Sequence, residues 1–182
     1  MSHQSTAVAS RTGNNPFLRT VAALSTLAGW CSAAMIVLAV AITCHMIFAR
    51  FVLNQSTIWQ TETVIYLAIG ATLIGLSYVQ KLRGHVNVDL IPLSLSKRAR
   101  YYMYLLTLSL SIAMVAVLFF YGYEHWQLTF DKNWKSDTVW GVRLWIPYLS
   151  LPIGFALYLL QLIADLVAVV LGIDKPYGLE DV

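Results

Sequence analysis

Two carboxylates, Glu62 and Asp165, interrupt apolar runs of this sequence and are its first candidates for chemistry. A carboxylate inside a membrane is costly to bury, so it suggests an ion path, a proton path or a buried ion pair. Glu62 lies one helical turn into its run, three residues after Trp59. We expect Glu62 to pair with Arg50 or Arg143, or with a cation on a partner protein.

The other polar candidates in apolar runs have simpler interpretations. Asp165 lies near the end of its run, four residues after Gln161 and therefore on the same helical face, and we expect a solvated or capped structural role. His45 and His125 lie near the ends of two other runs, where two facing imidazoles could ligate a b-type haem. Interfacial histidines are mostly hydrogen-bonded bystanders, so we expect no haem here.

No residue pattern predicts an enzyme. Cys31 and Cys44 are thirteen positions apart in one apolar run, which separates them by roughly 20 Å on a helix, so they cannot form a disulfide with each other. The sequence shows no nucleophile with a nearby base, no cluster of metal ligands and no glycine-rich phosphate loop. We therefore expect no catalytic residues, cofactor or metal.

Composition indicates a protein whose main solvent is lipid. Of its 182 residues 58% are hydrophobic and 12% are charged, and the mean hydropathy is +0.66. A helix needs about 20 apolar residues to cross a bilayer, and four runs are long enough. We predict an all-α integral membrane protein with spans at about 21–48, 58–79, 101–123 and 144–172. The net charge of +3 is not gathered into a patch interleaved with aromatics, so nucleic-acid binding is not expected.

The polar segments set the domain boundaries and the orientation. We expect a mobile tail at 1–18, one transmembrane domain at 19–173 and a second tail at 174–182. The short polar segment 50–57 makes the first two spans antiparallel neighbours. Eight of the twelve Lys and Arg residues fall on the side shared by both tails and the 80–100 loop. Cytoplasmic loops retain positive charge, so both termini are predicted to be cytoplasmic.

Two prolines shape the fourth span. Pro147 falls in its first turn, where the missing N–H costs little, whereas Pro152 removes the bond to the carbonyl of Tyr148 and predicts a kink. Pro152 and Gly154 also leave a notch of small residues that another helix could approach closely. The sequence leaves open whether that helix belongs to this chain or to a partner.

Four short motifs occur in a fixed order relative to the spans. They are Trp59-x-x-Glu62, Gly84-His85-Val86-Asn87-Val88-Asp89, Trp145-Ile146-Pro147 and Pro152-Ile153-Gly154. With four spans in about 180 residues, they resemble the small membrane subunit of tripartite ATP-independent periplasmic (TRAP) transporters, the DctQ-like family. The resemblance covers residues 20 to 172.

The resemblance implies a role in a three-protein uptake system of the bacterial inner membrane. A periplasmic binding protein delivers an organic acid, a large permease subunit transports it with sodium ions, and the small subunit widens the static scaffold. The motifs and the cations near Glu62 supply the residues expected at the partner interface: Trp59, Glu62, Arg50, Arg143, His85, Asp89, Pro147, Pro152 and Gly154. For His85 and Asp89, four positions apart, a plain helix-turn contact is an equal alternative.

Two other functions fit a small membrane protein of this kind. One is a proton-coupled multidrug exporter that uses Glu62, although a coupling carboxylate should lie nearer the membrane midplane. The other is a membrane anchor that binds haem through His45 and His125, which a visible spectrum would reveal.

Overall fold

The computed structural model describes residues 15–82 and 96–173. Over these residues the chain forms helices and, apart from one isolated bridge pair, no β-structure: α2 (Pro16–Phe51), α3 (Ile58–Lys81), α5 (Lys97–Asp131), α6 (Trp145–Tyr148) and α7 (Ser150–Val170). Four helical stretches are long and apolar enough to cross a membrane, and α6 with α7 makes up the fourth. The prediction of an all-helical fold with four such helices is confirmed.

The start of α2 follows from local chemistry. The Asn15 side chain accepts a hydrogen bond from the Phe17 N–H, and Pro16 occupies the first turn, where it needs no hydrogen-bond partner. The helix then continues for 36 residues. At 1.5 Å per residue this is about 54 Å, more than a hydrocarbon core of about 30 Å, so α2 must tilt or project from the membrane.

The third span differs from its predicted extent. The run was expected to end near Tyr123 with Trp126 in the following loop, but α5 continues to Asp131 and includes Trp126. No Gly or Pro follows Gly122 until Gly141, so nothing in the backbone stops the helix where its side chains become polar. The indole N–H of Trp126 donates to the carbonyl of Trp145, which joins α5 to α6.

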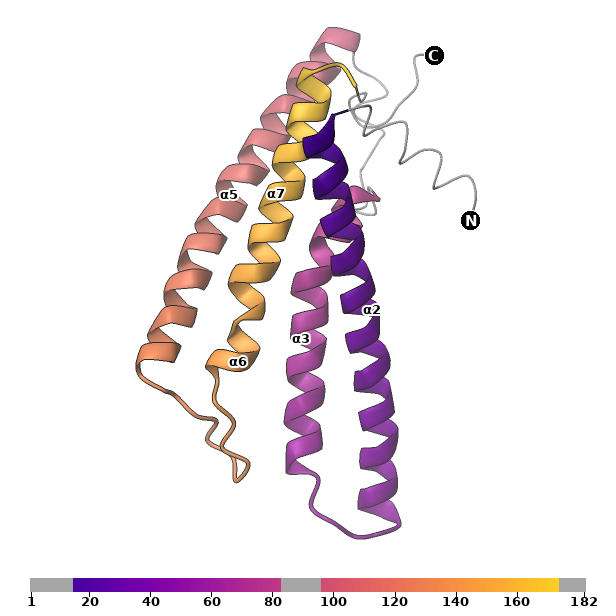
Figure 1. The fold of residues 1–182 in the computed structure, drawn as a ribbon, viewed down its shortest axis with the longest axis vertical. Helices are drawn as coiled ribbons and strands as arrows, with labels where there is room; N and C mark the ends of the chain where they lie inside the picture. The colour runs from indigo at the N-terminus through magenta and orange to yellow at the C-terminus, as the bar shows by residue number, and fades with distance from the viewer. Residues whose placement is uncertain (1–14, 83–95, 174–182) are drawn as a thin grey trace.

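The long helices lie side by side, in the order α5, α7, α3, α2 across the view in Figure 1. α7 packs against α2, α3 and α5 and is the central helix. We call the end with the α2–α3 and α5–α6 connections the connection end, and the opposite end, where α2 begins and α7 finishes, the terminal end. Asn15 and Ile173, the ends of the described chain, therefore lie on the same side of the helices.

The α2–α3 pair is held together by close approach of the two helices. A Cβ on Gly29 would lie 2.5 Å from the Tyr78 ring, and one on Gly75 would lie 2.8 Å from the Ser32 hydroxyl. The Ser32 hydroxyl donates to the carbonyl of Ala71 at 2.7 Å. The expectation that the first two spans are antiparallel neighbours is confirmed.

Two small clusters form the apolar core. Leu108 and Val115 of α5 pack on Leu162 of α7, whereas at the terminal end Leu18 and Val21 of α2 pack on Ala164 and Ala168 of α7. Large apolar side chains elsewhere on α2 and α5 remain exposed, among them Trp30 at 75% and Leu106 at 72%. These outward faces must be covered by lipid or by another protein.

Candidate functional site

Glu62 lies in the second turn of α3 and is 9% exposed. The Ser136 hydroxyl donates a hydrogen bond to its Oε1 atom. Its other oxygen, Oε2, is buried and has no hydrogen-bond partner within residues 15–82 and 96–173. Tyr66, one turn further along α3, interacts with both Ser136 and Glu62. The carboxylate thus has one hydroxyl donor, Ser136, and one oxygen without a hydrogen-bond partner among the described residues.

The residue that binds Glu62 belongs to a tight hairpin between α5 and α6. Lys135 pairs with Arg143 in an antiparallel bridge, and the Ser136 N–H donates to the Val142 carbonyl at 2.8 Å. The turn closes at Gly141, whose φ of +59° favours glycine. We call residues 134–144 the outer hairpin, because they enclose Glu62 from outside α3.

Of the pairings expected for Glu62, a contact with Arg50 or Arg143 is not found among the described residues, and pairing with a cation on a partner protein stays a prediction. Both arginines are exposed, and in the described chain Ser136 is the group that binds the carboxylate. The reason is that side chains alternate along the outer hairpin. Ser136 faces Glu62, so the adjacent bridge pair, Lys135 and Arg143, faces away from the carboxylate. Sequence reasoning missed Ser136, because turn-forming residues predict a loop but not the helix against which it folds.

Aromatic side chains connect the outer hairpin to α2 and α3. The Trp59 ring lies 6.5 Å from that of Trp140 and 6.2 Å from that of His45, measured between centroids. Trp59 remains 43% exposed. It therefore packs on its own chain with one side and presents the other at the connection end, where an aromatic belt is expected.

The predicted notch in the fourth span is occupied by this chain. Gly154 is buried against α3, and a Cβ there would lie 2.7 Å from the carbonyl oxygen of Leu73. Pro152 is buried too. The helix that approaches this notch therefore belongs to this chain and not to a partner. Pro152 and Gly154 do not form an open surface for a partner.

The regular helix assignment lapses near the position expected from Pro152, although Leu149 keeps helical angles, and the kink itself stays a prediction. The helix is interrupted at Leu149, between α6 and α7, next to Tyr148, whose carbonyl Pro152 cannot bond. Pro147 lies inside α6 and is partly buried. Its carbonyl accepts a hydrogen bond from the Ser150 hydroxyl at 2.7 Å, which stabilises the turn between the two helices.

A polar network near the terminal end binds the carboxylate of Asp165. The Gln161 and Gln80 side-chain amides each donate to the Asp165 carboxylate at 2.8 Å, and the Ser25 hydroxyl donates to Gln161 Oε1 at 2.7 Å. These contacts join α2, α3 and α7. Asp165 therefore has the capped structural role expected for it.

The two histidines considered as haem ligands lie against different helices. His45 contacts Trp59 on α3, whereas the ring of His125 lies 5.0 Å from that of Tyr148 on α6, so each imidazole packs against a different helix. No group of three or more metal-ligating side chains occurs among the described residues. His85 and Asp89 fall in the gap between the two described ranges, and their expected role stays a prediction.

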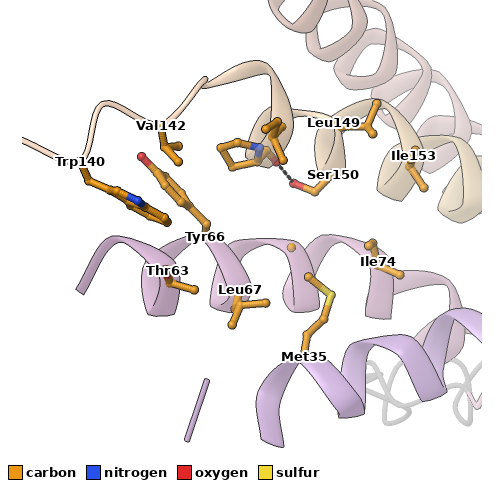
Figure 2. Close-up of a pocket in the computed structure, with 13 residues that line it drawn as sticks. Met35, Thr63, Tyr66, Leu67, Ile74, Trp140, Val142, Leu149, Ser150 and Ile153 are labelled. Carbon is orange, nitrogen blue, oxygen red and sulfur yellow. Dashed lines mark hydrogen bonds between the residues drawn. The ribbon is translucent and has the colours of Figure 1, made fainter. Parts of the chain in front are cut away.

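A cavity of about 340 Å³ lies between α3, the outer hairpin and the α6–α7 break (Figure 2). Figure 2 shows Trp140 and Val142 at one end of the cavity and Ile74 and Ile153 at the other, with Met35 reaching toward α3 from α2. Its walls are almost entirely apolar. No positively charged side chain lines it, whereas the carboxylate of an organic acid is usually bound by Arg, Lys or several N–H donors.

Comparison with known protein families identifies the chain. Residues 39–172 match the model of the DctQ component of tripartite ATP-independent periplasmic transporters. The chain belongs to the DctQ family. A search of the curated proteins finds no match.

Membership of the DctQ family makes the chain a component of a transporter. DctQ proteins are the small membrane component of TRAP transporters, a family of transporter parts and not of enzymes. With four helices long enough to span a bilayer, this DctQ protein is a multi-pass membrane protein. The matched region begins inside α2 and includes α3, α5 and the whole of α7, so it contains the outer hairpin and every member of the polar network except Ser25.

Proposed function

We propose that this DctQ protein acts as a scaffold for the large permease subunit of a TRAP transporter in a bacterial inner membrane. The observation that carries the proposal is the family match over residues 39–172. In such a system a periplasmic binding protein delivers the substrate, and the large subunit moves it together with sodium ions. An organic acid is the substrate class that the family suggests.

The internal contacts support a static role. In the described chain the buried carboxylate Glu62 binds Ser136, and Asp165 binds two glutamines that connect three helices. These groups are engaged in holding elements together. The helix break at Leu149 lies near the connection end, and α7 packs closely on α3 immediately beyond it. Such an arrangement suits a brace better than a moving transport domain.

The exposed apolar faces supply room for the partner. α2 and α5 lie on opposite sides of the row of helices and both expose large side chains (Figure 1). We propose that the large permease covers part of this surface and lipid covers the rest. We further propose that the connection end is periplasmic, since the distribution of Lys and Arg in the sequence predicts cytoplasmic termini.

The same geometry disfavours the exporter hypothesis. Glu62 lies in the second turn of α3, beneath the outer hairpin, and a carboxylate that exchanges protons for a drug needs a path near the midplane.

Copurification tests the proposal. An affinity tag on this protein should retain the large permease in mild detergent when the two are expressed together. The matched control is an unrelated four-helix membrane protein with the same tag. Recovery of the permease at the level of the control would contradict the proposal.

A further inference from the structure

The Glu62 carboxylate is buried with few groups to compensate its charge. Its Oε1 atom accepts from the Ser136 hydroxyl, and its Oε2 atom is buried without a hydrogen-bond partner among the described residues. Burying a carboxylate is costly unless a cation or several hydrogen bonds replace its hydration. The two cations of the outer hairpin, Lys135 and Arg143, face away from it. An external cation that reached Glu62 would therefore stabilise it more than the hairpin does.

The outer hairpin can move without losing its own structure. The Ser136 N–H donates to the Val142 carbonyl at 2.8 Å, and the Leu144 N–H donates to the Trp134 carbonyl at 3.0 Å. Both bonds join one strand of the hairpin to the other, so they would be kept if residues 134–144 moved as one body.

The packing between the outer hairpin and α3 is incomplete. Trp140 and Val142 line the cavity of about 340 Å³, so part of the space beneath the hairpin is unfilled (Figure 2). Side chains that border unfilled space lose dispersion contacts. The hydrogen bond to Glu62 and the edge contact between Trp140 and Trp59 hold the hairpin in place. Val139, at its tip, is 92% exposed.

We propose that the outer hairpin is a strap that covers Glu62 in the free subunit and swings open when the large permease binds. The uncovered carboxylate then pairs with a cationic side chain of the permease. Opening exchanges one neutral hydroxyl donor for a charge-assisted contact, which is the stronger interaction. Because the permease binds the open form better, it shifts the hairpin from closed to open. The inference rests on the proposed scaffold role.

Distances between two spin labels test the strap. Val139→Cys at the hairpin tip and Leu110→Cys on an exposed position of α5 carry the labels, after Cys31→Ala and Cys44→Ala remove the native thiols. We expect one distance population in the subunit alone and a second, distinct population in most molecules of the purified complex with the permease. The matched control pairs Leu110→Cys with Val40→Cys on α2, and its distance should not change.

Two further variants test what holds and what opens the strap. Ser136→Ala lacks the hydroxyl donor, so it should populate the second distance already without the permease. Glu62→Gln still accepts from Ser136 but offers no charge, so its hairpin should stay closed in complexes purified with the permease. Opening of Glu62→Gln to the wild-type extent would overturn the proposal.

The outcomes separate the strap from the scaffold role. An unchanged distance between the hairpin tip and α5 in a complex that has formed would overturn the strap and leave the scaffold role intact. Failure of the unlabelled wild-type subunit to copurify with the permease would overturn both.

Discussion

The backbone carbonyl of Leu73 occupies the space that any side chain at Gly154 would need, since a Cβ there would lie 2.7 Å from the carbonyl oxygen. Backbone cannot move aside as the tip of a flexible side chain can. Gly154→Ala should therefore force α7 away from α3 and destabilise the protein by about 1–3 kcal/mol, as overpacking typically does. Thermal unfolding in detergent measures the effect.

Gly122 provides the matched control. A Cβ there would lie 3.6 Å from Leu151 Cβ, an ordinary contact, so Gly122→Ala should leave the unfolding temperature unchanged or raise it slightly. Equal destabilisation by the two alanines would contradict the close α3–α7 packing.

The hydrogen bond from Ser136 to Glu62 predicts how the outer hairpin is held. Ser136→Ala leaves a buried carboxylate oxygen without its donor, which costs about 1–3 kcal/mol. Local opening of the hairpin should become about tenfold more frequent, and hydrogen exchange of its amides should accelerate by that factor. Thr107→Ala, which removes an exposed hydroxyl bonded within α5, should leave the exchange unchanged. Unaltered exchange in Ser136→Ala would show that other contacts hold the hairpin.

Glu62→Gln separates the internal role of Glu62 from a role toward a partner. The glutamine oxygen still accepts from Ser136, so exchange of the hairpin amides should stay near the wild-type rate. The substitution removes the negative charge, and with it any attraction to a cation on the large permease. Copurification and uptake should both fall, without a change in the substrate taken up. Normal assembly and uptake of the Glu62→Gln variant would show that the only role of the Glu62 side chain is its hydrogen bond with Ser136. Normal assembly with lost ion coupling would favour the exporter hypothesis.

Orientation is tested with reporter fusions. Alkaline phosphatase fused after Val182 should be inactive, and a fluorescent protein at the same position should be bright, because the sequence assigns eight of the twelve basic residues to the tails and the 80–100 loop. A phosphatase inserted after Asn54 should be active. The opposite pattern would place the outer hairpin in the cytoplasm.

Much of the fold was predictable, because membrane helices are encoded by long apolar runs. The short polar segment 50–57 was enough to make α2 and α3 antiparallel neighbours, as the contact between Ser32 and Ala71 confirms. The end of α5 was not predictable from hydropathy alone. Its last turns are polar, but they contain no residue that stops a helix.

The surroundings of Glu62 could not be predicted from sequence. Glu62 could be recognised as a candidate because burying a carboxylate in an apolar segment costs free energy. Its partner Ser136 is 74 positions away, in a connection whose fold depends on tertiary contacts. The sequence favoured Arg50 and Arg143 as partners of Glu62, because their charges can be read from the sequence. The side of the outer hairpin that faces α3 cannot be read from it. The occupant of the Gly154 notch was hidden for the same reason, since small residues show that a helix can approach without showing which one.

Uptake by reconstituted liposomes tests the central claim most directly. Vesicles containing the large permease, this DctQ protein and the external binding protein should accumulate an organic acid when a sodium gradient is applied. Vesicles containing this protein with the binding protein but without the permease should accumulate none, and vesicles with the permease but without this protein should lose most of the uptake. Uptake by this protein without the permease, or full uptake in its absence, would contradict the scaffold role.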